Sequence, residues 1–171
     1  MYTINEHIHR YSIWTAARAS QRGLKDFKIE TLKRILEIID FKNEVQKFFK
    51  SNPNKDDFNK FHKRIANEII NKGDDLNIKL TYGRASKIIS IYLKTAIIIP
   101  NEGKGNASDI IHAPIDSILL KALSKEYKIT KWGKLTWTKF SENEYWELIK
   151  DFEKNKLPIN WELERFWNPE D

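Results

Sequence analysis

The fold is decided by residues 81–100, which read TYGRASKIISIYLKTAIIIP. Apolar side chains occupy most positions from Ile88 to Ile99, so they cover most of the circumference of a helix rather than one stripe. Such a helix has to be buried on nearly every side. We therefore predict a central, buried helix over residues 81–98, stopped by Pro100, which disfavours helical geometry in the residue before it.

The sequence on both sides of this helix shows helical periodicity and helix start signals. A capping box opens at Thr3 and predicts a helix to Gln21, and a second capping box at Ser141 predicts a helix to Asn155. Apolar residues recur at the helical period through residues 29–40, 44–51 and 54–71, and again after Pro114. The prediction is an all-α, compact single domain over residues 1–171, a bundle of about seven helices.

The charge of the chain is unevenly spread. Residues 1–100 carry 19 Lys and Arg against 11 Asp and Glu, a net +8, whereas residues 101–171 carry 11 against 13, a net −2. A basic front half suits a surface that faces nucleic acid, although many proteins are this basic for solubility alone. The longest apolar run, residues 96–100, is far too short to span a membrane, and the N-terminus has no apolar signal core. We expect a cytoplasmic monomer that uses no membrane.

Several kinds of site are excluded or poorly supported by the sequence. Without cysteine there is no disulfide, thiolate zinc site or cysteine-bound iron–sulfur cluster. The four histidines show no metal-ligand spacing with carboxylates, and no nucleophile elbow or phosphate-binding loop is present. We therefore expect neither a metal nor a cofactor. Lys87 and Asp116 remain as the titratable pair of most interest.

A lysine held against an apolar helix loses water around its ammonium, which lowers its pKa and frees the amine as a nucleophile. An aspartate beside it can move protons or stabilise a developing positive charge on a sugar. The alternative for each residue is structural. Lys87 would be a solvated helix lysine, and Asp116 would sit early in its helix for the sake of the macrodipole.

Two segments, SKIISIYLKTAII (residues 86–98) and APIDSILL (residues 113–120), resemble the catalytic region of the helix-hairpin-helix DNA glycosylases. They look most like the archaeal 8-oxoguanine DNA glycosylase branch, in which a Ser-Lys-Thr helix precedes a Pro-Val-Asp helix start. The resemblance implies that Lys87 is the Schiff-base nucleophile that attacks deoxyribose C1′ and that Asp116 assists departure of the base. The Leu-Pro-Gly-Val-Gly hairpin of many members is absent, Tyr82-Gly83-Arg84 being its nearest remnant.

The resemblance implies a DNA glycosylase/AP lyase that acts on duplex DNA containing an oxidised or otherwise modified base. Such an enzyme extrudes the base into a pocket with stacking and edge-reading groups, and it grips the phosphates. The expected base-binding residues are His9, Trp14, Arg18 and His112. The expected phosphate-binding residues are Arg10, Tyr82, Gly83, Arg84 and Lys94.

Other interpretations of the same residues stay open at this point. Trp14 can instead be a core residue of an amphipathic first helix, and His62 is expected to be a half-buried surface residue. The whole chain can be a non-catalytic helical nucleic-acid-binding module in which Lys87 and Arg84 contact phosphates. It can also be a helical protein-interaction domain that docks through Trp161, Phe166 and Trp167 of its tail.

Overall fold

The computed structural model describes residues 1–170 and is built around the helix expected at its centre. Helix α5 spans Tyr82–Leu93, and 11 of its 12 residues are buried. It continues without a break into a π-helical turn, η1, over Lys94–Ile98. The predicted central helix over residues 81–98 is therefore confirmed, with its last turn wider than an α-helix.

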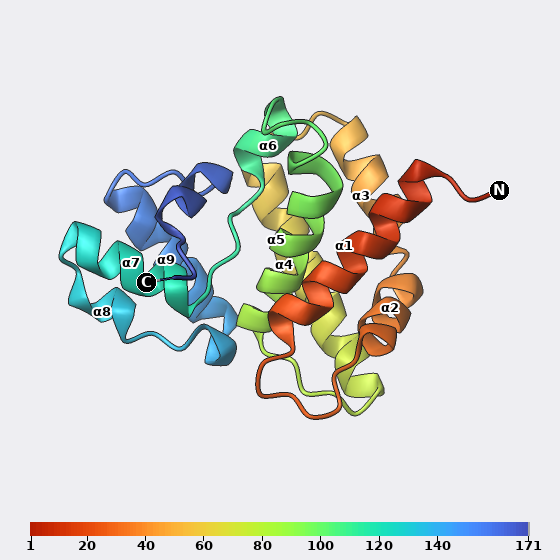
Figure 1. Ribbon diagram of the computed structural model, residues 1–171, viewed down its shortest axis with the longest axis horizontal. Coiled ribbons are helices and arrows are strands. Elements are labelled where there is room, and N and C mark those ends of the chain that lie inside the picture. The colour runs from red at the N-terminus through yellow and green to blue at the C-terminus, as the bar shows by residue number, and fades with distance from the viewer. Residues whose placement is uncertain (171) are drawn as a thin grey trace.

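Four helices precede α5 and surround it (Figure 1). They are α1 (Ile4–Ser20), α2 (Ile29–Ile38), α3 (Phe41–Lys50) and α4 (Lys55–Asp75). Helix α1 starts where its capping signal lies, since the Thr3 hydroxyl accepts a hydrogen bond from Glu6 N at 3.2 Å. Helices α1 and α4 make the most extensive contacts with α5. Together they leave little of α5 open to solvent.

The second half of the chain lies mostly on the left of Figure 1, with α6 at the top beside the end of the central helix. Its elements are α6 (Asn106–Ile110), α7 (Ser117–Tyr127), α8 (Thr130–Gly133), η2 (Trp137–Lys139), α9 (Glu142–Lys154) and η3 (Trp161–Phe166). The expected number of about seven helices is too low, because residues 1–170 form nine α-helices besides η1 and two 3-10 helices. The additional ones have three to six residues, too few to show a helical period in the sequence.

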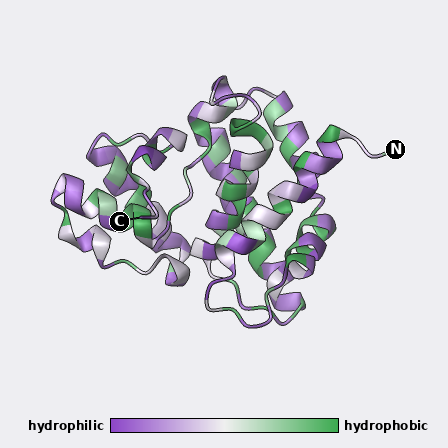
Figure 2. Ribbon diagram, viewed as in Figure 1, coloured by the Kyte–Doolittle hydropathy of each residue, from purple (hydrophilic) through white to green (hydrophobic). Residues whose placement is uncertain are grey.

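Apolar side chains from both halves form one hydrophobic cluster (Figure 2). Its largest fully buried members include Trp132, Tyr145 and Phe58. The contact between α5 and η2 is especially close at Gly83, where a Cβ atom would lie 1.9 Å from the Trp137 carbonyl oxygen. A larger residue at position 83 would separate the central helix from this segment.

Two histidines lie inside the core, which corrects the surface position expected for His62. Both His62 and His112 are buried, and they pack against the Tyr145 ring. The Tyr82 hydroxyl lies 3.2 Å from His62 Nδ1, and the Tyr145 hydroxyl lies 2.9 Å from His112 Nδ1. Sequence periodicity could not separate a half-buried from a buried position on α4.

Among the described helices, none combines the length and the apolar character needed to cross a membrane.

Candidate functional site

Lys87 lies on the second turn of α5, in the most buried part of the chain. The helix begins at Thr81, whose hydroxyl accepts from Arg84 N at 3.3 Å and donates to the Thr138 carbonyl at 2.8 Å. These bonds fix the N-terminal end of α5 against the segment around η2. As a result, Lys87 Nζ lies 4.4 Å from the centre of the Trp137 ring.

Asp116 is the N-cap of α7, one residue before the helix starts. Its Oδ1 accepts a hydrogen bond from Leu119 N at 3.0 Å, which satisfies one of the free N–H groups of the first turn. The sequence analysis placed Asp116 inside the first turn, so the structure moves it by one position. Its second carboxylate oxygen, Oδ2, is left free to face α5.

The two residues meet directly. Lys87 Nζ donates to Asp116 Oδ2 at 3.1 Å, and only 9% and 13% of the two side chains are exposed. Burial lowers the pKa of Lys87, and the Asp116 carboxylate opposes this by favouring the ammonium form. Weaker contributions come from Arg22, which lowers the pKa, and Glu164, which raises it. The net effect is a lysine that releases its proton more readily than an exposed one.

The C-terminal segment lies across this pair. Trp167 Nε1 donates to Asp116 Oδ2 at 3.0 Å, so the indole and the Lys87 ammonium share one oxygen. Glu164 lies within η3, and its Oε1 accepts a hydrogen bond from Lys94 Nζ at 2.6 Å. This bond holds the segment against the end of α5. The aromatic tail that was considered as a docking surface therefore packs on the protein itself.

Most of the expected phosphate-binding groups are occupied by internal contacts. Tyr82 is buried, and its hydroxyl accepts from Trp146 Nε1 at 2.9 Å. The Gly83 amide donates to the Phe140 carbonyl at 3.1 Å. The two terminal nitrogens of Arg84 donate to the carbonyls of Ser20 and Arg22 at 2.6 and 2.7 Å. Thus Arg84 holds the end of α1 against α5.

The two remaining members of that set differ in exposure. Lys94 is paired with Glu164, as described above. Arg10 is exposed on α1 and pairs with Glu6 at 3.0 Å, four residues earlier. An exposed ion pair of this kind contributes little to stability, so Arg10 can exchange Glu6 for another anion.

The expected base-binding residues are spread over three places. His9 hydrogen-bonds with the Tyr92 hydroxyl at 2.6 Å, and His112 lies in the core. Trp14 and Arg18 lie on the exposed face of α1, with the Arg18 guanidinium carbon 5.9 Å from the Trp14 ring centre. The alternative in which Trp14 is a core residue is wrong, because 43% of Trp14 is exposed. None of the four makes a hydrogen bond with Lys87 or Asp116 among the described residues.

The sequence analysis missed three residues that lie around the pair. They are Trp137 beneath Lys87, Trp167 on Asp116, and Arg22, whose charge reaches Lys87. Trp167 is 51 positions from Asp116 and Trp137 is 50 from Lys87. Their sequence surroundings carry no motif, so only the tertiary fold could identify them.

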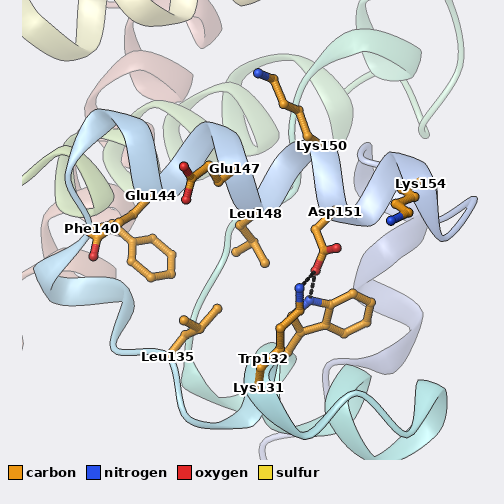
Figure 3. A pocket seen from close by; sticks show the side chains of 10 residues that line it. All are labelled: Lys131, Trp132, Leu135, Phe140, Glu144, Glu147, Leu148, Lys150, Asp151 and Lys154. Atoms are coloured by element: carbon orange, nitrogen blue, oxygen red, sulfur yellow. Dashed lines mark hydrogen bonds and ion pairs between the residues drawn. The ribbon is translucent and has the colours of Figure 1, made fainter.

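A separate hollow of about 410 Å³ lies between α8 and α9 (Figure 3). Asp151 is held there by Lys131 Nζ at 2.8 Å and by Trp132 Nε1 at 2.6 Å. The hydrogen bond from Lys131 has the largest effect on the pKa of Asp151, which it lowers, and the bond from Trp132 lowers this pKa further. The carboxylate is thereby fixed in place. Its lysine partner differs from Lys87 in burial, because 66% of the Lys131 side chain is exposed and only 9% of the Lys87 side chain is.

No group of three or more histidine, aspartate and glutamate residues within residues 1–170 is arranged to hold a metal ion. No protein-family model matches the sequence, and neither a curated protein nor a solved structure gives a significant match.

Proposed function

We propose that the protein is a DNA glycosylase/AP lyase that removes a modified base, with Lys87 as nucleophile and Asp116 as its proton-transfer partner. The observation that carries the proposal is the 3.1 Å contact between Lys87 Nζ and Asp116 Oδ2 in a nearly buried position. Nucleophilic catalysis by lysine requires desolvation and a partner that takes up a proton. Both requirements are met here by residues that the glycosylase-like segments also single out.

The reaction can be written on these two side chains. The neutral amine of Lys87 attacks C1′ of the deoxyribose, and the glycosidic bond breaks with its electron pair on the departing base, which takes a proton from water. One amine proton passes through Asp116 to O4′ as the C1′–O4′ bond opens, leaving a Schiff base. The hydroxide left by that water takes a C2′ proton, which expels the 3′ phosphate, and a second water hydrolyses the Schiff base and releases the lysine.

Access to the pair depends on the C-terminal segment. Asp116 Oδ2 accepts two hydrogen bonds in this structure, one from Lys87 and one from Trp167. A sugar approaching Lys87 has to replace the indole, which is 39% exposed and close to the end of the described chain. Trp137 lies against Lys87 and gives the site an aromatic wall. The substrate-bound form therefore has Trp167 displaced.

The test is borohydride trapping on duplexes that carry modified bases, beginning with 8-oxoguanine and an abasic site. The wild-type protein should form a covalent adduct. Lys87→Arg keeps the positive charge beside Asp116 but cannot form a Schiff base under these conditions, so it should form none. Lys121→Gln, an exposed lysine on α7, is the matched control and should trap normally. Normal trapping by Lys87→Arg would refute the assignment.

A second candidate is a non-catalytic nucleic-acid-binding module. It is favoured by the fact that both carboxylate oxygens of Asp116 already accept structural hydrogen bonds. Oδ1 accepts from Leu119 N, and Oδ2 accepts from Lys87 and Trp167. In that case Asp116 joins α7, α5 and the tail and does no chemistry. The protein would then bind modified and unmodified duplexes equally, with strong salt dependence and no release of a base.

A further inference from the structure

Helix α1 presents an exposed aromatic pair. The rings of Tyr11 and Trp14 are 5.7 Å apart and inclined by only 15°, and 52% and 43% of the two residues are exposed. Single exposed aromatic residues are ordinary on protein surfaces. Each ring of this pair covers one face of the other, and the Arg18 guanidinium carbon lies 5.9 Å from the Trp14 ring centre. The outer faces of the two rings, that of Tyr11 above all, are left for a further ring.

Two cations follow this pair along the chain. Arg18 follows Trp14 by four residues, a spacing that keeps both on one side of α1, and Arg22 lies in the turn just after the helix ends at Ser20. The arginine ion pairs within residues 1–170 are those of Arg10 and Arg64. The guanidinium groups of Arg18 and Arg22 are therefore free to take an anion. We call Tyr11, Trp14, Arg18 and Arg22 the α1 stripe.

The stripe ends beside the candidate site. The Arg22 carbonyl accepts from Arg84 Nη2 at 2.7 Å, and Arg22 acts on the pKa of Lys87. In Figure 1, α1 crosses the front of the bundle and its C-terminal end meets the start of α5. At about 1.5 Å per residue, the helical part of the stripe, from Tyr11 to the end of α1 at Ser20, spans roughly 14 Å.

Glu6, Glu30 and Glu37 line the hollow beside Tyr11 and Trp14, and two of these three are paired with cations. Glu6 is paired with Arg10 and Lys42 at 3.0 and 3.2 Å, and Glu37 is paired with Lys33 at 3.8 Å. The stripe thus combines flat aromatic faces with unpaired cations, which is the composition used to bind unpaired nucleotides. A base inside a duplex has both faces covered by its neighbours, so an unpaired strand fits the stripe better than duplex DNA.

We infer that the α1 stripe binds a short unpaired nucleic-acid strand next to the modified base, with bases stacked on Tyr11 and Trp14 and phosphates on Arg18 and Arg22. The part of this inference in which the strand leads to Lys87 rests on the proposed function, whereas binding of the strand to the stripe does not. An unpaired substrate also avoids the cost of extracting a base from a duplex stack. The inference therefore narrows the substrate to single-stranded or locally unpaired nucleic acid.

The test measures binding of a fluorescent 12-nucleotide thymidine strand and of a duplex of the same length by anisotropy at several salt concentrations. The wild-type protein should bind the single strand more tightly. Tyr11→Ala combined with Trp14→Ala should weaken strand binding at least about tenfold. Arg18→Gln combined with Arg22→Gln should weaken it and lower the salt slope by about 1.4. Lys121→Gln combined with Lys125→Gln, a matched loss of two exposed cations on α7, should change it less than twofold.

The outcomes separate this inference from the proposed function. If strand binding depends on the stripe but no borohydride adduct forms on any substrate, the stripe stands and the glycosylase proposal fails. If stripe variants bind the strand as tightly as the wild-type protein, the inference is overturned, whatever Lys87 does. Failure of the wild-type protein to bind a single strand at low salt also overturns it.

Discussion

Trp167 Nε1 donates a hydrogen bond to Asp116 Oδ2 at 3.0 Å across 51 positions of sequence. The same oxygen accepts from Lys87. One end of the chain thereby occupies the acceptor on which the proposed chemistry depends. The arrangement ties access to the lysine to the position of a single indole ring, and it leads directly to a first prediction.

Removing the Trp167 hydrogen bond should speed adduct formation. Trp167→Phe keeps an aromatic ring but has no donor, so Asp116 Oδ2 is left to Lys87 and the incoming substrate. We expect the trapping rate to rise several-fold, at a cost in unfolding free energy of about 1 kcal/mol. Trp161→Phe is the control, because the Trp161 ring packs on Gly103 away from the pair. A slower rate in Trp167→Phe would mean that the indole positions Asp116 for reaction.

Asp116→Asn should separate the capping role from the charge. Asparagine is as good an N-cap as aspartate, so α7 should keep its start. Loss of the carboxylate removes the main influence that raises the pKa of Lys87, so the pKa falls further and the pH profile of trapping shifts to lower pH. The maximal rate should nevertheless drop about 10²- to 10⁴-fold, because the proton-transfer group is gone.

The comparison for this variant is Glu164→Gln. Glu164 raises the pKa of Lys87 less than Asp116 does, so its loss should shift the profile in the same direction by a smaller amount and without the large fall in rate. Equal shifts in the two variants, or a shift to higher pH, would contradict the electrostatic account of the pair.

The sequence was informative wherever one element carried the whole signal. The apolar run from Ile88 to Ile99 was enough to place the central helix, and the capping signals at Thr3 and Ser141 coincide with real helix starts. The contact between Lys87 and Asp116 agrees with their pairing by motif, although their roles stay a prediction.

What the sequence could not supply were relationships between distant elements. The position of Trp167 depends on how η3 folds back over α7, and no local pattern encodes that return. Trp14 was ambiguous for a related reason, since its spacing allowed either side of α1 to face the bundle. The choice depended on the small residues Ala16 and Ala17, which are fully buried and let α1 approach α5 closely.

Gly83→Ala should be strongly destabilising. A Cβ atom there would lie 1.9 Å from the Trp137 carbonyl and 3.0 Å from Phe140 Cβ, so the backbone of α5 and the η2 segment would have to separate. We expect a loss of about 3 kcal/mol or more, measured by urea denaturation. Gly133→Ala is the comparison, because a Cβ atom there would lie 2.9 Å from the Ser124 hydroxyl and 3.2 Å from Ser124 Cβ, much milder contacts than the one with the Trp137 carbonyl. Equal losses in the two variants would contradict the close contact.

Mild acid should destabilise the protein through its buried histidines. Burial lowers the pKa of His112 to about 3 and lowers that of His62 as well, whereas both titrate near 6.5 in the unfolded chain. Below pH 6.5 the unfolded state therefore binds more protons than the folded state, and the free energy of unfolding decreases as the pH falls. Each histidine should contribute up to about 1.4 kcal/mol per pH unit. Urea titrations between pH 6.5 and 5 measure this slope above the range in which carboxylates titrate.

Replacing one histidine isolates its share of the slope. His112→Phe fits among Phe58 and Tyr145, removes one titrating group and leaves the Tyr145 hydroxyl without its partner. The variant should lose stability at neutral pH and lose the share of the acid dependence that belongs to His112, while His62 and His9, whose pKa values burial also lowers, keep theirs. His7→Gln, which changes an exposed histidine on α1, should leave the slope unchanged. An unaltered slope in His112→Phe would mean that His112 takes up its proton over the same pH range in the folded core as in the unfolded chain, although its Nε2 has no partner among the described residues.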